Sequence, residues 1–297
     1  MRGDFDDKAP DSRRFEEDED LYFDAIEGPI LQQSPDTLRP GFSWISYFQR
    51  QHPGYEFIRF EEIPFNEDFP DLKVARVALV SAAGIHMEGQ KPFSIAPGVV
   101  DEELIQLKFK EAGDPTFRVI QSDADPSLLR LAHPHMEVSA AEEDINVVFP
   151  ISRMAELTAE EVIGEVAPRH ISFMGYLPFP GALNDSIGEA VDLLRNDGVD
   201  AAILLPGEVL SHQTMAVVQK ELESAGISTV AIALCRDLIE AIGVPRAVHY
   251  RYPFGYTFGY ANDAVMQLRI LKDALRTLEE ADEPGAINDL PYEWIQS

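Results

Sequence analysis

The residues best suited to chemistry lie together between Val199 and Gly226, where Glu208, Ser211 and His212 follow a short apolar run. That run predicts a strand and the residues from Ser211 onward predict a helix, so Glu208 should lie at a helix N-terminus. A carboxylate in that place can act as a general base, a metal ligand or an anchor for a substrate ammonium group. Adjacent residues such as Ser211 and His212 rarely give a nucleophile and its base workable geometry, and no G-x-S-x-G motif occurs. We therefore expect Ser211 to cap the helix and His212 to donate a hydrogen bond to a substrate.

Four further histidines could contribute to a site: His86, His133, His135 and His170. His133 and His135 are two residues apart, which puts both rings on the same side of an extended segment and makes a metal set conceivable. Buried histidines that serve the core are more common, so we predict a shared pocket containing His86, His133 and His170, and no metal.

Arginines supply candidate substrate binders, because a guanidinium group holds a planar carboxylate by two hydrogen bonds. Arg118, Arg153 and Arg246 are the candidates, although each could equally form a structural ion pair in so acidic a chain. The loop from Gly255 to Gly259 lacks the dinucleotide-binding pattern, so neither NAD nor another nucleotide is supported.

The elements that must position these residues alternate between strand and helix in the second half of the chain. Strands are predicted at 74–81, 117–120, 146–149, 170–174, 201–205, 228–234 and 247–250, and helices at 44–51, 152–163, 183–196, 211–225, 236–242 and 263–280. This alternation predicts an α/β fold with a mainly parallel, Rossmann-like open sheet and helices on both faces. Ligands of such sheets bind beyond the carboxyl ends of the strands, so Glu208, Ser211, His212 and His86 should line one pocket there.

Three segments are expected along the chain. Residues 1–21 are acidic and almost without aliphatic side chains, which predicts a disordered tail. Residues 22–73 form an aromatic-rich N-terminal extension that should pack on the main domain, and residues 74–297 form that domain.

Charge and cysteine content restrict the partners. With 52 acidic and 24 basic residues the net charge is −28, which argues against binding to nucleic acid or to anionic membrane surfaces. Cys235 is the only cysteine, so the chain has no internal disulfide and no dithiol pair, and we expect this thiol to be buried and structural. No signal sequence and no run long enough to cross a bilayer is visible, so a cytoplasmic protein is expected.

Several ordered blocks carry a family resemblance. They are SAAGIHMEGQKPF (81–93), GDPTFRVI (113–120), DINVVFPISRMAEL (144–157), IGEVAPRHISFMG (163–175), PGEVLSHQT (206–214) and PRAVHYRYPFGYTFG (245–259). With them the chain resembles the selenoprotein B subunits of glycine, sarcosine, betaine and D-proline reductases. In that family a selenocysteine or cysteine, two residues and a cysteine precede His-Gln-Thr. Aligned on His212 to Thr214, Glu208 takes the selenocysteine position and Ser211 the cysteine position.

The resemblance implies a small amino acid, imino acid or related nitrogen compound as substrate, bound by Arg118, His133, His170, Arg153 and Thr214. Because a carboxylate cannot perform thiol redox chemistry, the first hypothesis is acid–base catalysis by Glu208 with His212, Ser211 and His86, giving elimination, isomerisation or bond cleavage. The alternatives are a redox-dead subunit that binds substrate or a partner, and a reductase that uses an external thiol or Cys235. No cofactor is required, and a pyruvoyl group enters only if a partner subunit supplies it. A homo-oligomer or a partner subunit is possible.

Overall fold

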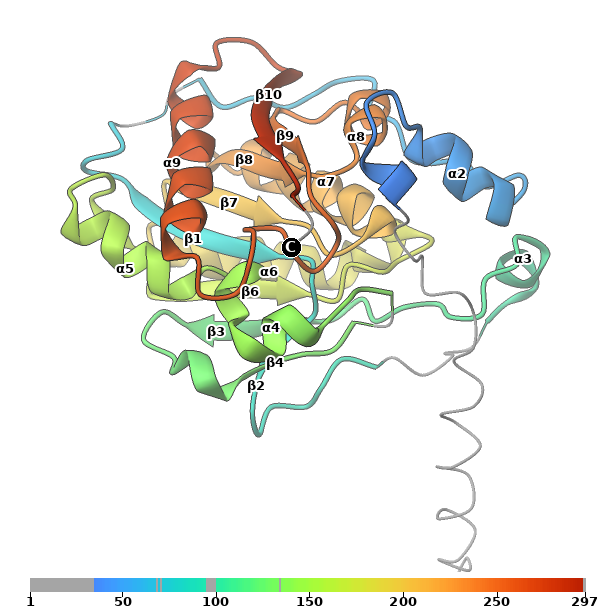
Figure 1. Ribbon diagram of the computed structural model, residues 1–297, viewed down its shortest axis with the longest axis horizontal. Coiled ribbons are helices and arrows are strands. Elements are labelled where there is room, and N and C mark those ends of the chain that lie inside the picture. Colours follow the sequence, from blue (N-terminus) through green and yellow to red (C-terminus); the bar gives the residue numbers. More distant parts are fainter. Residues whose placement is uncertain (1–34, 68, 70, 95–99, 134, 296–297) are drawn as a thin grey trace, which may run out of the picture. The chain divides into compact units, whose positions relative to one another are not determined.

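The computed structural model describes residues 35–67, 69, 71–94, 100–133 and 135–295. The described residues all belong to one compact unit (Figure 1). The acidic tail predicted at 1–21 and the first part of the predicted extension lie outside the described residues.

A mainly parallel sheet forms the centre of this unit, in the order β10-β9-β8-β7-β1-β6-β3. Its strands are β1 (Arg76–Ser81), β3 (Phe117–Gln121), β6 (Arg169–Phe173), β7 (Ala201–Leu205), β8 (Ser228–Ala233), β9 (Arg246–Arg251) and β10 (Ala286–Glu293). All pairings are parallel except that of β3 with β6, and the short β5 (Glu165–Val166) pairs with the start of β1. The predicted α/β class with a mainly parallel sheet is confirmed.

Helices cover both faces of this sheet, which explains why its central strands are continuous apolar runs. α7 (Val209–Ser224) packs on β7 and β8 and lies beside α6 (Asn184–Asn196) and α8 (Arg236–Ile242), whereas α9 (Ala264–Glu280) packs on β8, β9 and α5 (Ile151–Ala159). Figure 1 shows α9 in front of the sheet and α6 and α7 behind it. Every residue of β7 is buried.

Smaller elements surround the sheet. β2 (Ile85–Met87) and β4 (Leu129–Leu131) form an antiparallel pair. The remaining helices among the described residues are α2 (Trp44–Gln51), α3 (Glu102–Gln106) and α4 (Ser139–Glu143), with 3₁₀ turns η3 (Pro35–Leu38), η4 (Pro126–Leu128), η5 (Ile145–Val147) and η6 (Pro180–Leu183). In the described part of the chain, no helix has the length and apolar composition that a membrane span requires.

The N-terminal segment contacts the sheet domain at widely separated points. The Tyr55 hydroxyl donates to the carbonyl of Pro178 at 2.6 Å, and the backbone N-H of Phe60 donates to the carbonyl of Ile242 at 2.8 Å. The backbone N-H of Asn66 donates to the Glu223 carboxylate at 2.6 Å. These bonds attach residues 55–66 to loops and helices on the C-terminal half of the chain.

Several predicted elements differ from the structure, among them the helix predicted at 152–163, which is α5 and ends at Ala159. The strand predicted at 146–149 is the 3₁₀ turn η5, because Asp144 accepts the Asn146 N-H at 3.0 Å and Asn146 in turn caps α5 through the Ser152 N-H at 3.0 Å. The helix predicted from Ser211 begins earlier, at Val209, because Glu208 is its N-cap residue.

Candidate functional site

Glu208 closes a tight turn between β7 and α7. Its two carboxylate oxygens accept the backbone N-H groups of Leu210 and Ser211, each at 2.9 Å, so the side chain caps the helix that follows it. The Ser211 hydroxyl donates to the Glu208 carbonyl at 2.5 Å and accepts the Gly207 N-H at 2.8 Å. The expected role of Ser211 as N-cap is therefore taken by Glu208, and Ser211 fastens the turn from inside.

The three residues that follow attach this turn to different parts of the molecule. His212 Nδ1 donates to the Glu208 carbonyl at 2.8 Å, while its Nε2 accepts the backbone N-H of Leu234, just beyond β8, at 3.0 Å. Thr214 donates to the Gly175 carbonyl at 2.7 Å. Both ring nitrogens of His212 are thus occupied, and burial lowers its pKa to about 4, so the ring is a neutral bridge rather than a free donor.

Gln213 links the turn to the N-terminal segment. Its side-chain amide donates to the Tyr55 hydroxyl at 2.6 Å and to the Leu177 carbonyl at 2.9 Å. Neither Gln213 nor Tyr55 was predicted as a site residue from the sequence. The available signal was the adjacency of Gln213 to His212 and the cluster of aromatic residues around Tyr55.

Burial dominates the electrostatics of Glu208, whose side chain is fully shielded from solvent. Loss of hydration raises its pKa from 4.5 to about 7, and this effect outweighs the lowering by His135 and by the helix N-H groups. Burial also raises the pKa of the Tyr55 and Tyr176 hydroxyls, with a further rise caused by the Glu208 charge.

His133 faces the same turn. A Cβ added to Gly207 would come within 2.9 Å of His133 Nε2 and 2.7 Å of the Ala82 carbonyl oxygen, so only glycine fits between them. The Nδ1 atom of His133 accepts the His135 N-H at 3.3 Å, which leaves Nε2 as the protonated nitrogen. Nε2 is buried without a hydrogen-bond partner among the described residues, and burial lowers the ring's pKa to about 3. No room for a ligand atom remains between this nitrogen and Gly207, so a ligand could engage the donor only after the ring or the turn moves.

His86 and Arg118 form a separate neighbourhood on β2 and β3. The His86 ring lies 6.5 Å from that of Phe93, and Arg118 stacks over Phe93 at 4.2 Å. Burial lowers the His86 pKa, and the charges of Arg118 and Arg130 lower it further. The Arg118 guanidinium donates to the carbonyls of Lys91 and Pro92 at 2.7 and 3.0 Å. These donors therefore hold the segment that follows β2. Among the described residues no hydrogen bond or ring contact joins His86 to the Glu208 turn.

The remaining predicted binders lie in structural settings. His170 accepts the Leu79 N-H at 3.1 Å inside the sheet, and burial lowers its pKa to about 4. Arg153 pairs with Glu156 one turn along α5 at 2.8 Å. Arg246 pairs with the buried Glu223 at 3.3 Å. Within the described ranges, no group of three or more His, Cys, Asp or Glu side chains is arranged to hold a metal ion.

Cys235 lies at the start of α8 and is completely buried. Burial raises its pKa well above the ordinary value, and the negative charges of Asp237 and Glu208 add to the rise. A thiol in this setting is neither ionised nor accessible at neutral pH, which is unfavourable for thiol chemistry.

Comparison with known proteins finds related reductase subunits. The chain is 35% identical over 226 residues to the D-proline reductase subunit gamma of Acetoanaerobium sticklandii, which covers 76% of this chain and 87% of that protein. It is 23% and 26% identical to the glycine reductase complex component B subunits gamma of Peptoclostridium acidaminophilum and Carboxydothermus hydrogenoformans, over 80% and 77% of this chain. The matched region spans about half of these two relatives, 53% and 51% of their length. No family model and no solved structure matches the chain.

Proposed function

This chain belongs to the family of the D-proline reductase gamma and glycine reductase component B gamma subunits, and we propose that it is a selenium-free member that works by proton transfer. Its proposed substrate is a small amino acid, imino acid or related nitrogen compound, the class that the names of its relatives indicate. The proposed reaction is an elimination, isomerisation or bond cleavage that begins with removal of a proton.

The observation that carries this proposal is the setting of Glu208. A carboxyl group with a pKa near 7 is present in both the acid and the base form at neutral pH, which is the condition for efficient general acid–base catalysis. The resemblance of the loop aligns this residue with the selenocysteine of the reductases. A carboxylate cannot form and exchange disulfides, and among the roles open to it the raised pKa favours proton transfer.

Two side chains act on the substrate in this proposal. Glu208 exchanges the proton, and the Nε2-H of His133, which has no partner among the described residues, donates to a substrate oxygen once the turn and the ring have moved apart. Ser211, His212 and Thr214 hold the turn in place through bonds within the chain. Because Glu208 is fully buried, substrate entry requires movement of its surroundings, and we assign this movement to the segment around Tyr55, which is bonded to Gln213.

A second candidate is a subunit that binds a partner and has no catalytic step of its own. It is favoured by the closed state of the turn, since both oxygens of Glu208 and both nitrogens of His212 are already bonded. In this case the turn is a remnant of a catalytic loop that now serves as a rigid helix start. Any pyruvoyl group would then belong to the partner.

Hydrogen exchange at the substrate separates the two candidates. Purified protein is incubated with D-proline or glycine in D₂O, and loss of the Cα-H signal is followed by ¹H NMR, which detects proton removal even without net turnover. We expect exchange with the natural chain and with Glu221→Gln, a change at an exposed glutamate of the same helix, and none with Glu208→Gln. Failure of the natural chain to promote exchange, alone and with the proteins that copurify with it, would leave the binding-subunit function as the better account.

A further inference from the structure

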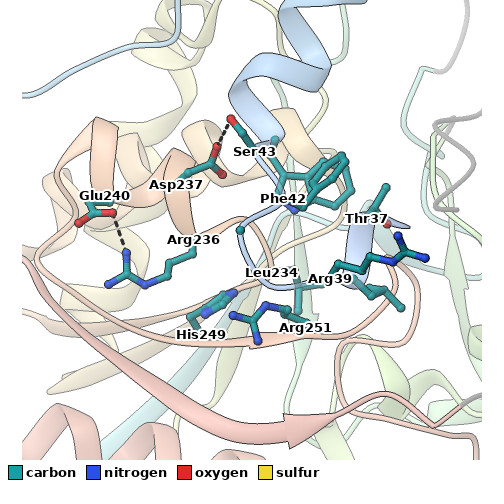
Figure 2. Close-up of a pocket in the computed structure, with 13 residues that line it drawn as sticks. Thr37, Arg39, Phe42, Ser43, Leu234, Arg236, Asp237, Glu240, His249 and Arg251 are labelled. Carbon is teal, nitrogen blue, oxygen red and sulfur yellow. Dashed lines mark hydrogen bonds and ion pairs between the residues drawn. The ribbon is translucent and has the colours of Figure 1, made fainter. Parts of the chain in front are cut away.

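A pocket of about 200 Å³, whose lining does not include Glu208, lies beyond the carboxyl ends of β8 and β9. One wall comes from the strand ends, with Leu234 just after β8 and His249 and Arg251 on β9, and the other from residues between Thr37 and Trp44 (Figure 2). This edge of a parallel sheet is where α/β proteins bind ligands. The volume suits a small molecule.

Cationic groups gather at the strand-end wall although the chain as a whole is strongly acidic. Figure 2 shows the Arg236 and Arg251 side chains on either side of the His249 ring. The charge of Arg236 is balanced, because its guanidinium pairs with Glu240 at 2.6 Å and with Asp289 at 3.0 Å. His249 Nδ1 bonds to Asp289 as well, at 2.6 Å.

Arg251 is different from these neighbours, because its guanidinium makes no hydrogen bond or ion pair with any described residue. It is half-buried and lines the pocket. The planar donor edge of an arginine matches a carboxylate, which it binds through two parallel hydrogen bonds. The opposite wall supplies the apolar side chains of Phe42 and Trp44.

We propose that this pocket binds a small carboxylate anion, with the carboxylate on Arg251 and its carbon skeleton against Phe42 and Trp44. The site does not use Glu208 and is independent of the function proposed above. The Phe42 wall is held in position by α8, since Asp237 accepts the Ser43 hydroxyl at 2.8 Å and the Ile45 N-H at 3.2 Å. The bound anion therefore bridges the N-terminal segment and the edge of the sheet.

The chain contains a natural reporter for this binding. Trp44 lines the pocket and is one of only two tryptophans, so Trp294→Phe makes its fluorescence specific. In that background, acetate, D-proline and inorganic phosphate are titrated separately. We expect a saturable change with acetate and D-proline, and at least a roughly tenfold weaker affinity in Arg251→Gln, as for the loss of a charge-assisted hydrogen bond.

Arg195→Gln is the matched control, because Arg195 is an exposed arginine of α6 and should leave the affinity unchanged. Circular dichroism verifies that each variant is folded, and Arg251→Gln should be, since no bond to the described residues is lost. Absence of a saturable response to both carboxylates in fluorescence and calorimetry overturns the proposal. So does equal affinity of Arg251→Gln, and tighter binding of phosphate than of either carboxylate shows that the ligand class is wrong.

Discussion

Glu208 makes two opposite contributions to the stability of the fold. As an N-cap it stabilises α7 by about 1 kcal/mol, an amount that a neutral cap residue supplies equally well. A rise of its pKa from 4.5 to about 7 means that keeping the group ionised in the folded state costs roughly 3 kcal/mol. A side chain that costs more stability than its cap contributes is typical of a functional site.

Replacing Glu208 by glutamine should therefore stabilise the protein in a pH-dependent way. The folded state binds a proton at Glu208 between pH 7 and 4.5 and the unfolded state does not, so the natural chain loses stability as pH rises through this window. We expect Glu208→Gln to raise the free energy of unfolding by about 2–3 kcal/mol at pH 8 and by almost nothing near pH 5. Urea unfolding at the two pH values measures this.

Glu223 provides the contrast for this experiment, because it is also buried on α7 but pairs with Arg246 at 3.3 Å. Glu223→Gln leaves the arginine charge buried without its partner and should destabilise the protein by about 3 kcal/mol or more. If Glu208→Gln is destabilising to the same degree at both pH values, the carboxylate is a structural cap and the catalytic role loses its main support.

Cys235 should be chemically silent in the folded protein. Because its thiol is fully buried and burial raises its pKa, we expect no reaction with Ellman's reagent until the protein unfolds in urea. Cys235→Ser should retain whatever activity the natural chain has. Rapid labelling of the folded protein, or loss of activity in folded Cys235→Ser, would favour a reductase that uses this thiol.

The sequence predicted the position of this site better than its internal bonds. That Glu208 follows a strand and precedes a helix could be read from local patterns. That His212 bridges to Leu234, or that Thr214 bonds to Gly175, could not, because these partners are 22 and 39 residues away and their proximity depends on the sheet order. The expected grouping of His86 with Glu208 remains a prediction.

At the scale of elements, strong local signals determined which boundaries could be predicted. α2 was predicted with the observed bounds because Ser43 caps it, and β7 because its apolar run is interrupted on both sides. β10 was missed, since this edge strand contains Pro291 and exposed Asn288 and Asp289 and has little apolar pattern. Its strand character comes from pairing with β9, which no local pattern encodes.

Removing a single oxygen atom should weaken the attachment of the N-terminal segment to α7. Tyr55→Phe removes the hydroxyl that accepts from Gln213 and donates to Pro178, so we expect a loss of about 1–2 kcal/mol and faster amide exchange in residues 44–60. Tyr47→Phe is the control, because the Tyr47 hydroxyl makes no hydrogen bond with the described residues. Hydrogen exchange measured by mass spectrometry reports both. If exchange increases equally in the two variants, Tyr55 does not fasten this segment.

At the scale of the whole molecule, the buried histidines together make the free energy of unfolding depend on pH more strongly than any single residue does. Burial lowers the pKa of six of the seven histidines, to about 3 for His133 and about 4 for His170 and His212, with smaller shifts for His52, His86 and His249. Near neutral pH these rings are uncharged in both the folded and the unfolded state, so they do not lower the free energy of unfolding. As pH falls below about 6.5, the histidine rings bind protons in the unfolded state but not in the folded state, so the free energy of unfolding decreases.

The protein should therefore unfold in mild acid despite its many carboxylates. His133, His170 and His212 together remove about 4 kcal/mol per pH unit between pH 6 and 4.5, and protonation of buried Glu208 returns about 1.4 kcal/mol of this. With a typical stability of roughly 5–15 kcal/mol, the net slope brings the folded state to its limit between about pH 5 and 4. Urea unfolding at half-unit pH intervals measures the slope, and Glu208→Gln should make it steeper by about 1.4 kcal/mol per pH unit. A stability that stays constant from pH 7 to 4.5 would mean that these rings already carry protons in the folded state, and the neutral His212 bridge between α7 and β8 would then be wrong.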